Sequence, residues 1–257
     1  MSGFSAGELT HDGYLGGLLH LHQPRTGYRA GVDPVLLAAS VPAVSGQTIL
    51  ELGCGAGAVI LCLGARVPGL ELHGVELQAD YADLARQNAS ENNIALEVTT
   101  ADLSDLPSAL RQISFDHVLA NPPYFRAQGH TPAQDPGRRV ALGEATPLAD
   151  WVRVAAKRLA PKGFLHIIQR TERLPELLAA CAGRLGSVEV LPLAARTGRS
   201  PDLVIMRARK SGRAAFVMHA PVILHQGIRH AKDENSYTIE IERVLRDAKA
   251  LNWQTGQ

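Results

Sequence analysis

The chain has 257 residues, of which 46% are hydrophobic and 20% are charged, and its formal net charge at pH 7 is +1. This length is enough for one large domain or two small ones, and the composition is that of an ordinary globular protein. The near-neutral charge argues against binding a polyanion through bulk charge alone. No apolar stretch approaches the roughly 18 residues of a membrane span, and the N-terminus lacks a basic head and an apolar run, so we expect a cytoplasmic protein with no membrane partner.

Residues 1–46 are expected to form an N-terminal extension that packs on a main domain of residues 47–257. The stretch Leu18-Leu19-His20-Leu21-His22 predicts a small hairpin or edge strands. Its two histidines lie at strand spacing, which puts both rings on one face, but the sequence shows no third metal ligand. Further on, Asp33 is placed to act as an N-cap and Pro34 as the first residue of a short apolar helix.

From residue 48 onward the chain alternates short β runs with helical segments, which is typical of a parallel sheet covered by helices on both faces. The connection from Ala194 to Pro201 is too short for a helical crossover and indicates an antiparallel hairpin. We therefore predict an α/β fold with a doubly wound, Rossmann-like, mostly parallel seven-stranded sheet and a C-terminal antiparallel hairpin. The predicted strands are 48–52, 71–75, 96–100, 115–120, 164–169, 188–193 and 203–207, with a further apolar strand near 216–224, and the predicted helices are 58–66, 79–92, 148–159, 174–185 and 239–250.

A glycine-rich loop follows the first of these strands and opens a helix, in the sequence Glu51-Leu52-Gly53-Cys54-Gly55-Ala56-Gly57-Ala58. Glycines let the backbone approach a ligand closely, and a helix N-terminus presents unpaired N–H groups. Glu76 ends the second strand, where an acid would grip ribose hydroxyls. Taken alone, this pattern fits either NAD or S-adenosylmethionine.

Two further acids favour S-adenosylmethionine. Glu51 would face a pyrophosphate unfavourably, but it can accept hydrogen bonds from the amino group of a methionine moiety, directly or through water. Asp102 follows the third strand, where its side chain could contact the adenine amino group. Glu51, Glu76 and Asp102 thus mark three successive strand ends at the ligand-binding edge of the sheet.

The stretch Ala120-Asn121-Pro122-Pro123-Tyr124-Phe125 ends the fourth strand at the same edge. Prolines explain a strand end, because they stop ladder pairing, but they leave Asn121 and Tyr124 unused. An exocyclic amine on an aromatic base is a poor nucleophile, since its lone pair is delocalised into the ring. The Asn121 side-chain oxygen and the Pro122 carbonyl could accept its two N–H groups and turn the lone pair toward an electrophile, while Tyr124 stacks on the base. This predicts an in-line methyl transfer that needs neither a metal nor a covalent intermediate.

These motifs resemble the class I S-adenosylmethionine-dependent methyltransferases with the N/D-P-P-Y/F/W amino-methylating motif. Within that class the chain looks like the small bacterial family that includes the adenine-N6 methyltransferases acting beside the anticodon of a valine tRNA. The resemblance covers nearly the whole chain and rests on Tyr28-Arg29-Ala30-Gly31-Val32-Asp33, on the Glu51 to Gly57 loop and on Asn121 to Phe125. It implies S-adenosylmethionine as cofactor and the N6 amine of a tRNA adenine as acceptor. The implied cofactor contacts are Asp33, Gly53, Gly55, Glu76 and Asp102, and the implied catalytic residues are Asn121, Pro122 and Tyr124.

Other acceptors with a planar nitrogen stay open at this point. They are adenine N6 or guanine N2 of ribosomal RNA, adenine of DNA, and the side-chain amide of a protein glutamine. DNA enzymes usually need a sizeable target-recognition region, whereas residues 125–147 form only a lid-sized loop, and the glutamine enzymes carry a helical domain ahead of the glycine loop. A binding protein or NAD-dependent module that kept the fold is the non-enzymatic alternative.

Two segments are candidates for contact with RNA. In the long loop we expect Phe125, Arg138 and Arg139 to bind the substrate, the arginines through phosphates near the target base. From residue 191 to 232 there are eight Lys or Arg and a single acid, Asp202, which predicts either a basic surface facing a nucleic acid or a solvated face balanced by acids elsewhere. The three cysteines lack C-x-x-C spacing and suggest neither a disulfide framework nor a zinc site, so no metal is expected.

Overall fold

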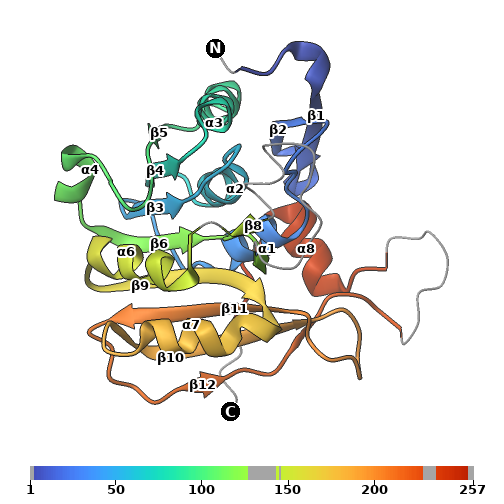
Figure 1. Ribbon diagram of the computed structural model, residues 1–257. Coiled ribbons are helices and arrows are strands. Elements are labelled where there is room, and N and C mark those ends of the chain that lie inside the picture. Colours follow the sequence, from blue (N-terminus) through green and yellow to red (C-terminus); the bar gives the residue numbers. More distant parts are fainter. Residues whose placement is uncertain (1–2, 127–142, 145, 228–235, 254–257) are drawn as a thin grey trace.

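The structure is a computed structural model that describes residues 3–126, 143–144, 146–227 and 236–253 (Figure 1). Within these ranges the main sheet has nine strands, two of which contain only two residues. In pairing order the strands are β12 (Val217–Met218), β10 (Leu185–Ala194), β11 (Leu203–Lys210), β9 (Leu159–Arg170), β6 (Phe115–Ala120), β3 (Thr48–Leu52), β4 (Glu71–Glu76) and β5 (Leu96–Thr100), and β13 (Val222–Ile223) also pairs with β10.

Strand direction divides this sheet into two parts. The strands β5, β4, β3, β6 and β9 are parallel to one another. In contrast, β11 is antiparallel to both of its neighbours, β9 and β10, while β12 and β13 run parallel to β10. The predicted mostly parallel sheet with a C-terminal antiparallel hairpin is therefore confirmed, and the two-residue strands β12 and β13 add to the seven strands that the sequence predicted.

Successive residues of each strand point to opposite sides of the sheet, so both faces carry apolar side chains. Helices cover both faces and bury these side chains. Ile49 and Leu119 belong to one hydrophobic core, and Leu50 and Val118 belong to the other. The first core packs against α1 (Asp33–Ser40), α2 (Ala58–Arg66), α3 (Ala79–Glu91) and α8 (Ile239–Asp247). The second core packs against α4 (Ser108–Gln112), α6 (Leu148–Arg158) and α7 (Leu174–Cys181).

The N-terminal hairpin forms a separate two-stranded sheet beside α3 (Figure 1). Its strands are β1 (Leu9–Tyr14) and β2 (Leu19–Pro24), as the sequence predicted. Asn88 of α3 contacts the N–H and carbonyl of His22 at 2.8 and 3.1 Å, and Asn92 contacts those of His20 at 2.9 and 2.6 Å. The two amides satisfy backbone groups that a strand edge would otherwise leave unpaired. The short elements of the chain are η1 (Ala6–Glu8), η2 (Leu15–Gly17), η3 (Thr171–Arg173), β7 (Phe125–Arg126) and β8 (Gly143–Glu144).

Several element boundaries differ from the prediction. The helix α7 ends at Cys181 rather than near residue 185, because Gly183 adopts a left-handed φ of +72° and Leu185 already pairs in β10. The segment 216–224 forms only β12 and β13, since the proline between them interrupts ladder pairing. The five-residue helix α4 was not predicted, because it is too short to show a helical period.

No helix within the described ranges is long and apolar enough to cross a membrane. Cys54, Cys62 and Cys181 are all buried and free, as the lack of a disulfide pattern predicted.

Candidate active site

Strand register brings the predicted site residues to one edge of the sheet. Leu52 of β3 pairs with Ala120 of β6, so the residues that follow, Gly53 and Asn121, lie side by side. On the other side of β3, Leu52 pairs with Val75, which places the end of β4 next to the glycine loop. The connections after β3 and β6 run toward opposite edges of the sheet, and open α/β sheets bind ligands at such a switch point.

A cavity of about 570 Å³ opens at this edge, a size typical of sites for small molecules. It collects most of the residues that the sequence predicted to be functional. Its lining includes Asp33, Gly53, Gly55, Glu76, Asp102, Asn121, Pro122 and Tyr124. Glu51 instead lines a small cavity of about 40 Å³, which shares Gly53 and Asn121 with the large one.

Three glycines set the path of the loop after β3. Gly53, Gly55 and Gly57 have φ angles of +64°, +53° and +88°, which favour glycine. A Cβ on Gly53 would lie 2.6 Å from the indole of Trp151, so this glycine also lets α6 pack against the loop. The loop therefore borders the cavity with backbone where any other residue would place a side chain.

Glu76 ties the end of β4 to the glycine loop. Its carboxylate accepts hydrogen bonds from the N–H groups of Gly55 and Gln78, each at 2.9 Å. Burial raises the pKa of Glu76, and these backbone hydrogen bonds oppose the rise. Because an ionised carboxylate offers about four acceptor positions, Glu76 keeps capacity for the hydroxyls of a bound ribose.

The other two acids have contrasting surroundings. Glu51 is only 1% exposed, and its Oε2 accepts a hydrogen bond from the Ile60 N–H at 3.0 Å. Burial raises the pKa of Glu51 well above its usual value, and the charge of Glu76 adds to the rise. Asp102 is exposed, and the hydrogen bond from the Ser104 N–H at 2.7 Å lowers its pKa.

A tyrosine from the N-terminal segment holds the Asn121 amide. Asn121 Nδ2 donates to Tyr28 Oη at 3.3 Å, which leaves Asn121 Oδ1 as the acceptor of this amide. The Tyr28 N–H donates to Tyr81 Oη at 3.1 Å, and the Tyr81 hydroxyl donates to the Tyr28 carbonyl at 3.4 Å. Burial raises the pKa of Tyr28, so its hydroxyl keeps its proton at neutral pH.

The prolines after Asn121 rest on a buried glutamine. Gln169 of β9 is fully buried, and its Nε2 donates to the carbonyls of Pro122 and Pro123 at 3.4 and 3.3 Å. Ala120 pairs with Ile167, and this parallel register carries Gln169 alongside the prolines. A carbonyl oxygen has two lone pairs, so Pro122 can accept a second hydrogen bond.

Tyr124 is anchored to the N-terminal segment through Asp33. Its hydroxyl donates to Asp33 Oδ2 at 2.6 Å, and both burial and the nearby carboxylate raise the pKa of Tyr124. The predicted N-cap role of Asp33 is wrong, because Val32 occupies the N-cap and Asp33 is the first residue of α1. The carboxylate is free of a capping task and holds the tyrosine across 91 residues of sequence.

The three predicted RNA contacts are only partly described by the structure. Phe125 contributes its backbone to β7, whereas Arg138 and Arg139 lie outside the described residues. Sequence reasoning missed Tyr28 and Gln169 as neighbours of the Asn-Pro-Pro-Tyr segment. Tyr28 opens the motif that ends at Asp33 and could have been found there, but nothing in the sequence around Gln169 marks it.

Several cations of the basic segment 191–232 have partners within the protein. Arg207 forms two hydrogen bonds with Glu189 at 2.9 and 2.7 Å and lies 4.2 Å from the centre of the Trp253 ring. Lys210 donates to the Leu159 carbonyl at 2.6 Å. Arg196 is buried and donates to Ser236 Oγ at 3.1 Å. These cations stabilise the antiparallel part of the sheet and the C-terminal segment that packs on it.

The strand order, the glycine loop and the cavity at the switch point are those of a Rossmann-like protein that binds a nucleotide-containing cofactor, and the family match identifies it as a methyltransferase. Residues 30–191 match the family model of the methyltransferase small domain, and the chain belongs to this family.

Similar proteins carry more specific names. The chain is 26% identical over 231 residues to the tRNA1(Val) (adenine(37)-N6)-methyltransferase of Actinobacillus succinogenes, across 89% of this chain and 93% of that protein. It is 31% identical over 200 residues to a protein of the same name from Porphyromonas gingivalis, across 72% of this chain and 76% of that one.

Solved structures agree on the fold. A predicted O-methyltransferase from Agrobacterium tumefaciens matches with a TM-score of 0.68 and 26% identity, across 87% of this chain and all of that one (100%). The 16S rRNA N2 G1207 methyltransferase of T. thermophilus, solved with AdoMet and guanosine, matches with a TM-score of 0.55 and 20% identity, across 79% of this chain and 50% of that one.

Proposed function

We propose that this protein transfers a methyl group from S-adenosylmethionine to the N6 amine of an adenine in tRNA. One observation carries the proposal: the Asn121 amide lies on the wall of the same cavity as the glycine loop, and its nitrogen is committed to Tyr28. Its oxygen is therefore the atom left to receive an N–H group of a substrate. Relatives that share 24% to 32% identity with this chain are named for adenine N6 in tRNA, which supports this acceptor.

The residues of the cavity fit S-adenosylmethionine. Most of the predicted contacts are hydrogen-bond acceptors for donor groups of the cofactor. The Glu76 carboxylate can accept from the ribose hydroxyls, and the Asp102 carboxylate can accept from the amino group of the adenine. Glu51 lines the small cavity, which shares Gly53 and Asn121 with the large one, and from there it would accept hydrogen bonds from the methionine amino group, directly or through water. When bound, the cofactor would supply a methyl group on a positively charged sulfur, which would keep the electron pair of the broken methyl–sulfur bond and leave as the neutral thioether of S-adenosylhomocysteine.

The chain's own groups prepare the amine for attack. Asn121 Oδ1 and the Pro122 carbonyl each accept one N–H group of the target amine, which turns the nitrogen lone pair away from conjugation with the ring. The nitrogen becomes positively charged as its bond to the methyl carbon forms, and the two carbonyl dipoles stabilise that charge. The product then loses one amine proton to solvent. Tyr124, held by Asp33, offers its ring to the base.

Further parts of the proposal concern the substrate and its setting. We retain Phe125, Arg138 and Arg139 as contacts to the RNA, the arginines through phosphates. We treat residues 1–46 as an extension of a methyltransferase domain of residues 47–257, and the cytoplasm as the place where the enzyme meets its RNA.

The test is tritium transfer from labelled S-adenosylmethionine into total RNA from a strain that lacks this gene, followed by fractionation and nucleoside analysis. Label in N6-methyladenosine of the tRNA fraction is the expected result. Label confined to ribosomal RNA, or to DNA or protein in parallel reactions, would refute tRNA as the substrate, while the protein would still be a methyltransferase. A calorimetric titration that detects binding of NAD but not of S-adenosylhomocysteine would refute the cofactor.

A further inference from the structure

Three histidines and a glutamate meet on the outer face of the N-terminal hairpin. His11 of β1 pairs directly with His22 of β2, and their rings stack with centroids 4.6 Å apart. The ring of His20 lies on the same face and stacks on His11 at 5.1 Å. None of these residues lines either of the two cavities, so the cluster is separate from the candidate active site.

The glutamate comes from α3 and is already oriented. His22 Nε2 lies 2.8 Å from Glu91 Oε2, and the second oxygen of Glu91 accepts a hydrogen bond from Gln87 Nε2 at 3.0 Å. Gln87 therefore holds the carboxylate in place, and hydrogen bonds of this kind from a second residue are usual for carboxylates that bind metals.

One donor atom from each of His11, His22 and Glu91 lies within 4.8 Å of the other two. Zinc binds imidazole nitrogen and carboxylate oxygen at about 2.0 to 2.2 Å, so its ligand atoms lie roughly 3.3 Å apart in a tetrahedral site. The backbone of His22 is held against α3, because Asn88 contacts both of its polar backbone groups. Closing the site needs rotation of side chains, and the exposed His11 ring would have to turn from its stacking on His22 and His20.

We propose that His11, His22 and Glu91 form a zinc site, with solvent in the fourth position, that fastens the hairpin to α3. Imidazole together with carboxylate is a donor set that suits zinc.

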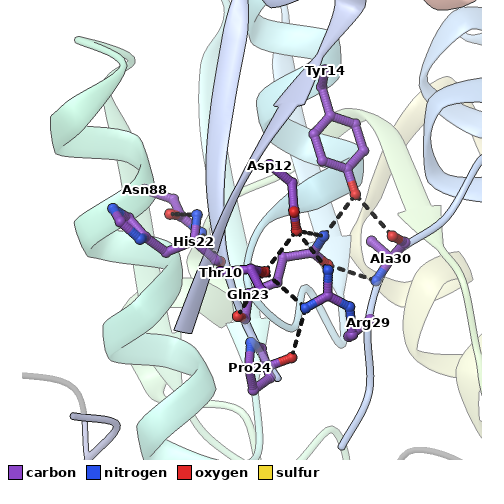
Figure 2. A network of polar contacts seen from close by, with 9 residues as sticks. All are labelled: Thr10, Asp12, Tyr14, His22, Gln23, Pro24, Arg29, Ala30 and Asn88. Atoms are coloured by element: carbon purple, nitrogen blue, oxygen red, sulfur yellow. Dashed lines mark hydrogen bonds and ion pairs between the residues drawn. The ribbon is translucent and has the colours of Figure 1, made fainter. Parts of the chain in front are cut away.

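The site would act on a hairpin that is coupled to the substrate cavity. Figure 2 shows Asp12, Gln23 and Arg29 in one network on the inner face of the hairpin. Asp12 Oδ2 accepts from Gln23 Nε2 at 2.9 Å and from Arg29 Nη2 at 2.8 Å, and Gln23 Oε1 accepts from the Ala30 N–H at 2.7 Å. Because Gln23 follows His22 directly, a metal on His22 restrains the segment that begins with Tyr28.

The first measurement is a zinc titration of tag-free protein that has been stripped with EDTA, by calorimetry or by competition with a chromophoric chelator. We expect one equivalent of zinc per chain. His11→Gln, His22→Gln and Glu91→Gln should each weaken binding by roughly tenfold or more. Glu97→Gln is the matched control, since the His73–Glu97 pair, at 3.5 Å, has a histidine and a glutamate but, among the described residues, no third ligand.

The second measurement is the urea midpoint with and without zinc, because a metal that binds only the folded state raises stability. We expect zinc to raise the midpoint of the wild type and of Glu97→Gln, and to leave that of His22→Gln unchanged. Circular dichroism in EDTA confirms that each variant is folded. Absence of zinc binding by the wild type, or binding that survives both histidine substitutions, would overturn the proposal.

Discussion

Asn121→Ala tests the proposed chemistry most directly, because it removes one of the two acceptors for the target amine. In the free protein it also removes the 3.3 Å hydrogen bond to Tyr28, a loss worth about 1 kcal/mol of stability. In the transition state it removes an oxygen that faces the developing positive charge. Loss of one preorganised hydrogen-bond partner of this kind lowers kcat by about 10² to 10³, or roughly 2.7 to 4 kcal/mol. We expect that loss in the rate of methyl transfer and almost none in cofactor affinity.

The assay is single-turnover transfer of labelled methyl groups to the tRNA fraction, with calorimetric binding of S-adenosylhomocysteine measured alongside. Asn121→Asp serves as the matched variant: it keeps an acceptor oxygen at the same position, and the Tyr28 hydroxyl can donate to it. Its rate should lie between those of the wild type and the alanine variant. Methyl transfer by Asn121→Ala at the original rate would refute the mechanism, and so would a loss of cofactor binding as large as the loss of rate.

Three more predictions concern positioning and stability. Tyr28→Phe removes the hydroxyl that accepts from the Asn121 amide, so under the proposed mechanism kcat should fall by up to about tenfold while the melting temperature changes little. An unchanged kcat would exclude a positioning role for Tyr28. Gly53→Ala adds a Cβ at a φ of +64° and 2.6 Å from Trp151, so a urea titration should show destabilisation of roughly 1 to 3 kcal/mol, and an unchanged midpoint would contradict the observed packing. Burial lowers the pKa of His117 to about 4 and that of its neighbour His166 well below the usual value. Histidines of the unfolded chain bind protons near pH 6.5, so the free energy of unfolding should decline as pH falls from about 6.5 toward 4. Each of the two histidines contributes up to about 1.4 kcal/mol per pH unit, so the decline should be less steep in His117→Gln. Equal slopes for wild type and variant would contradict this role of His117.

The sequence predicted the framework of the site because each part is a short contiguous motif at a strand end. The loop after β3 and the Asn-Pro-Pro-Tyr segment after β6 lie at the same edge in any parallel sheet that contains both strands. The pairing of Leu52 with Ala120 brings the two segments together. The same reasoning missed Gln169, because an isolated glutamine in an apolar strand carries no local signal. It also assigned Asp33 to a helix cap, since nothing nearby in the sequence points to Tyr124.

The histidines of the hairpin show the same limit. The His20-x-His22 spacing placed two rings on one face, as strand geometry requires. His11 and Glu91 complete the cluster from another strand and from a helix, and only the folded chain brings them within reach.

By itself the sequence determined the alternation of strands and helices, the glycine loop and the amide that follows the fourth strand, because period, turn chemistry and strand ends are local properties of a chain. Tertiary structure alone decided which residues hold those parts in place. Tyr28 orients Asn121 and Asp33 anchors Tyr124 across more than 90 residues, since the separations are 93 and 91. Hydrogen bonds of that kind depend on how distant elements pack, and neither local propensity nor spacing records the packing.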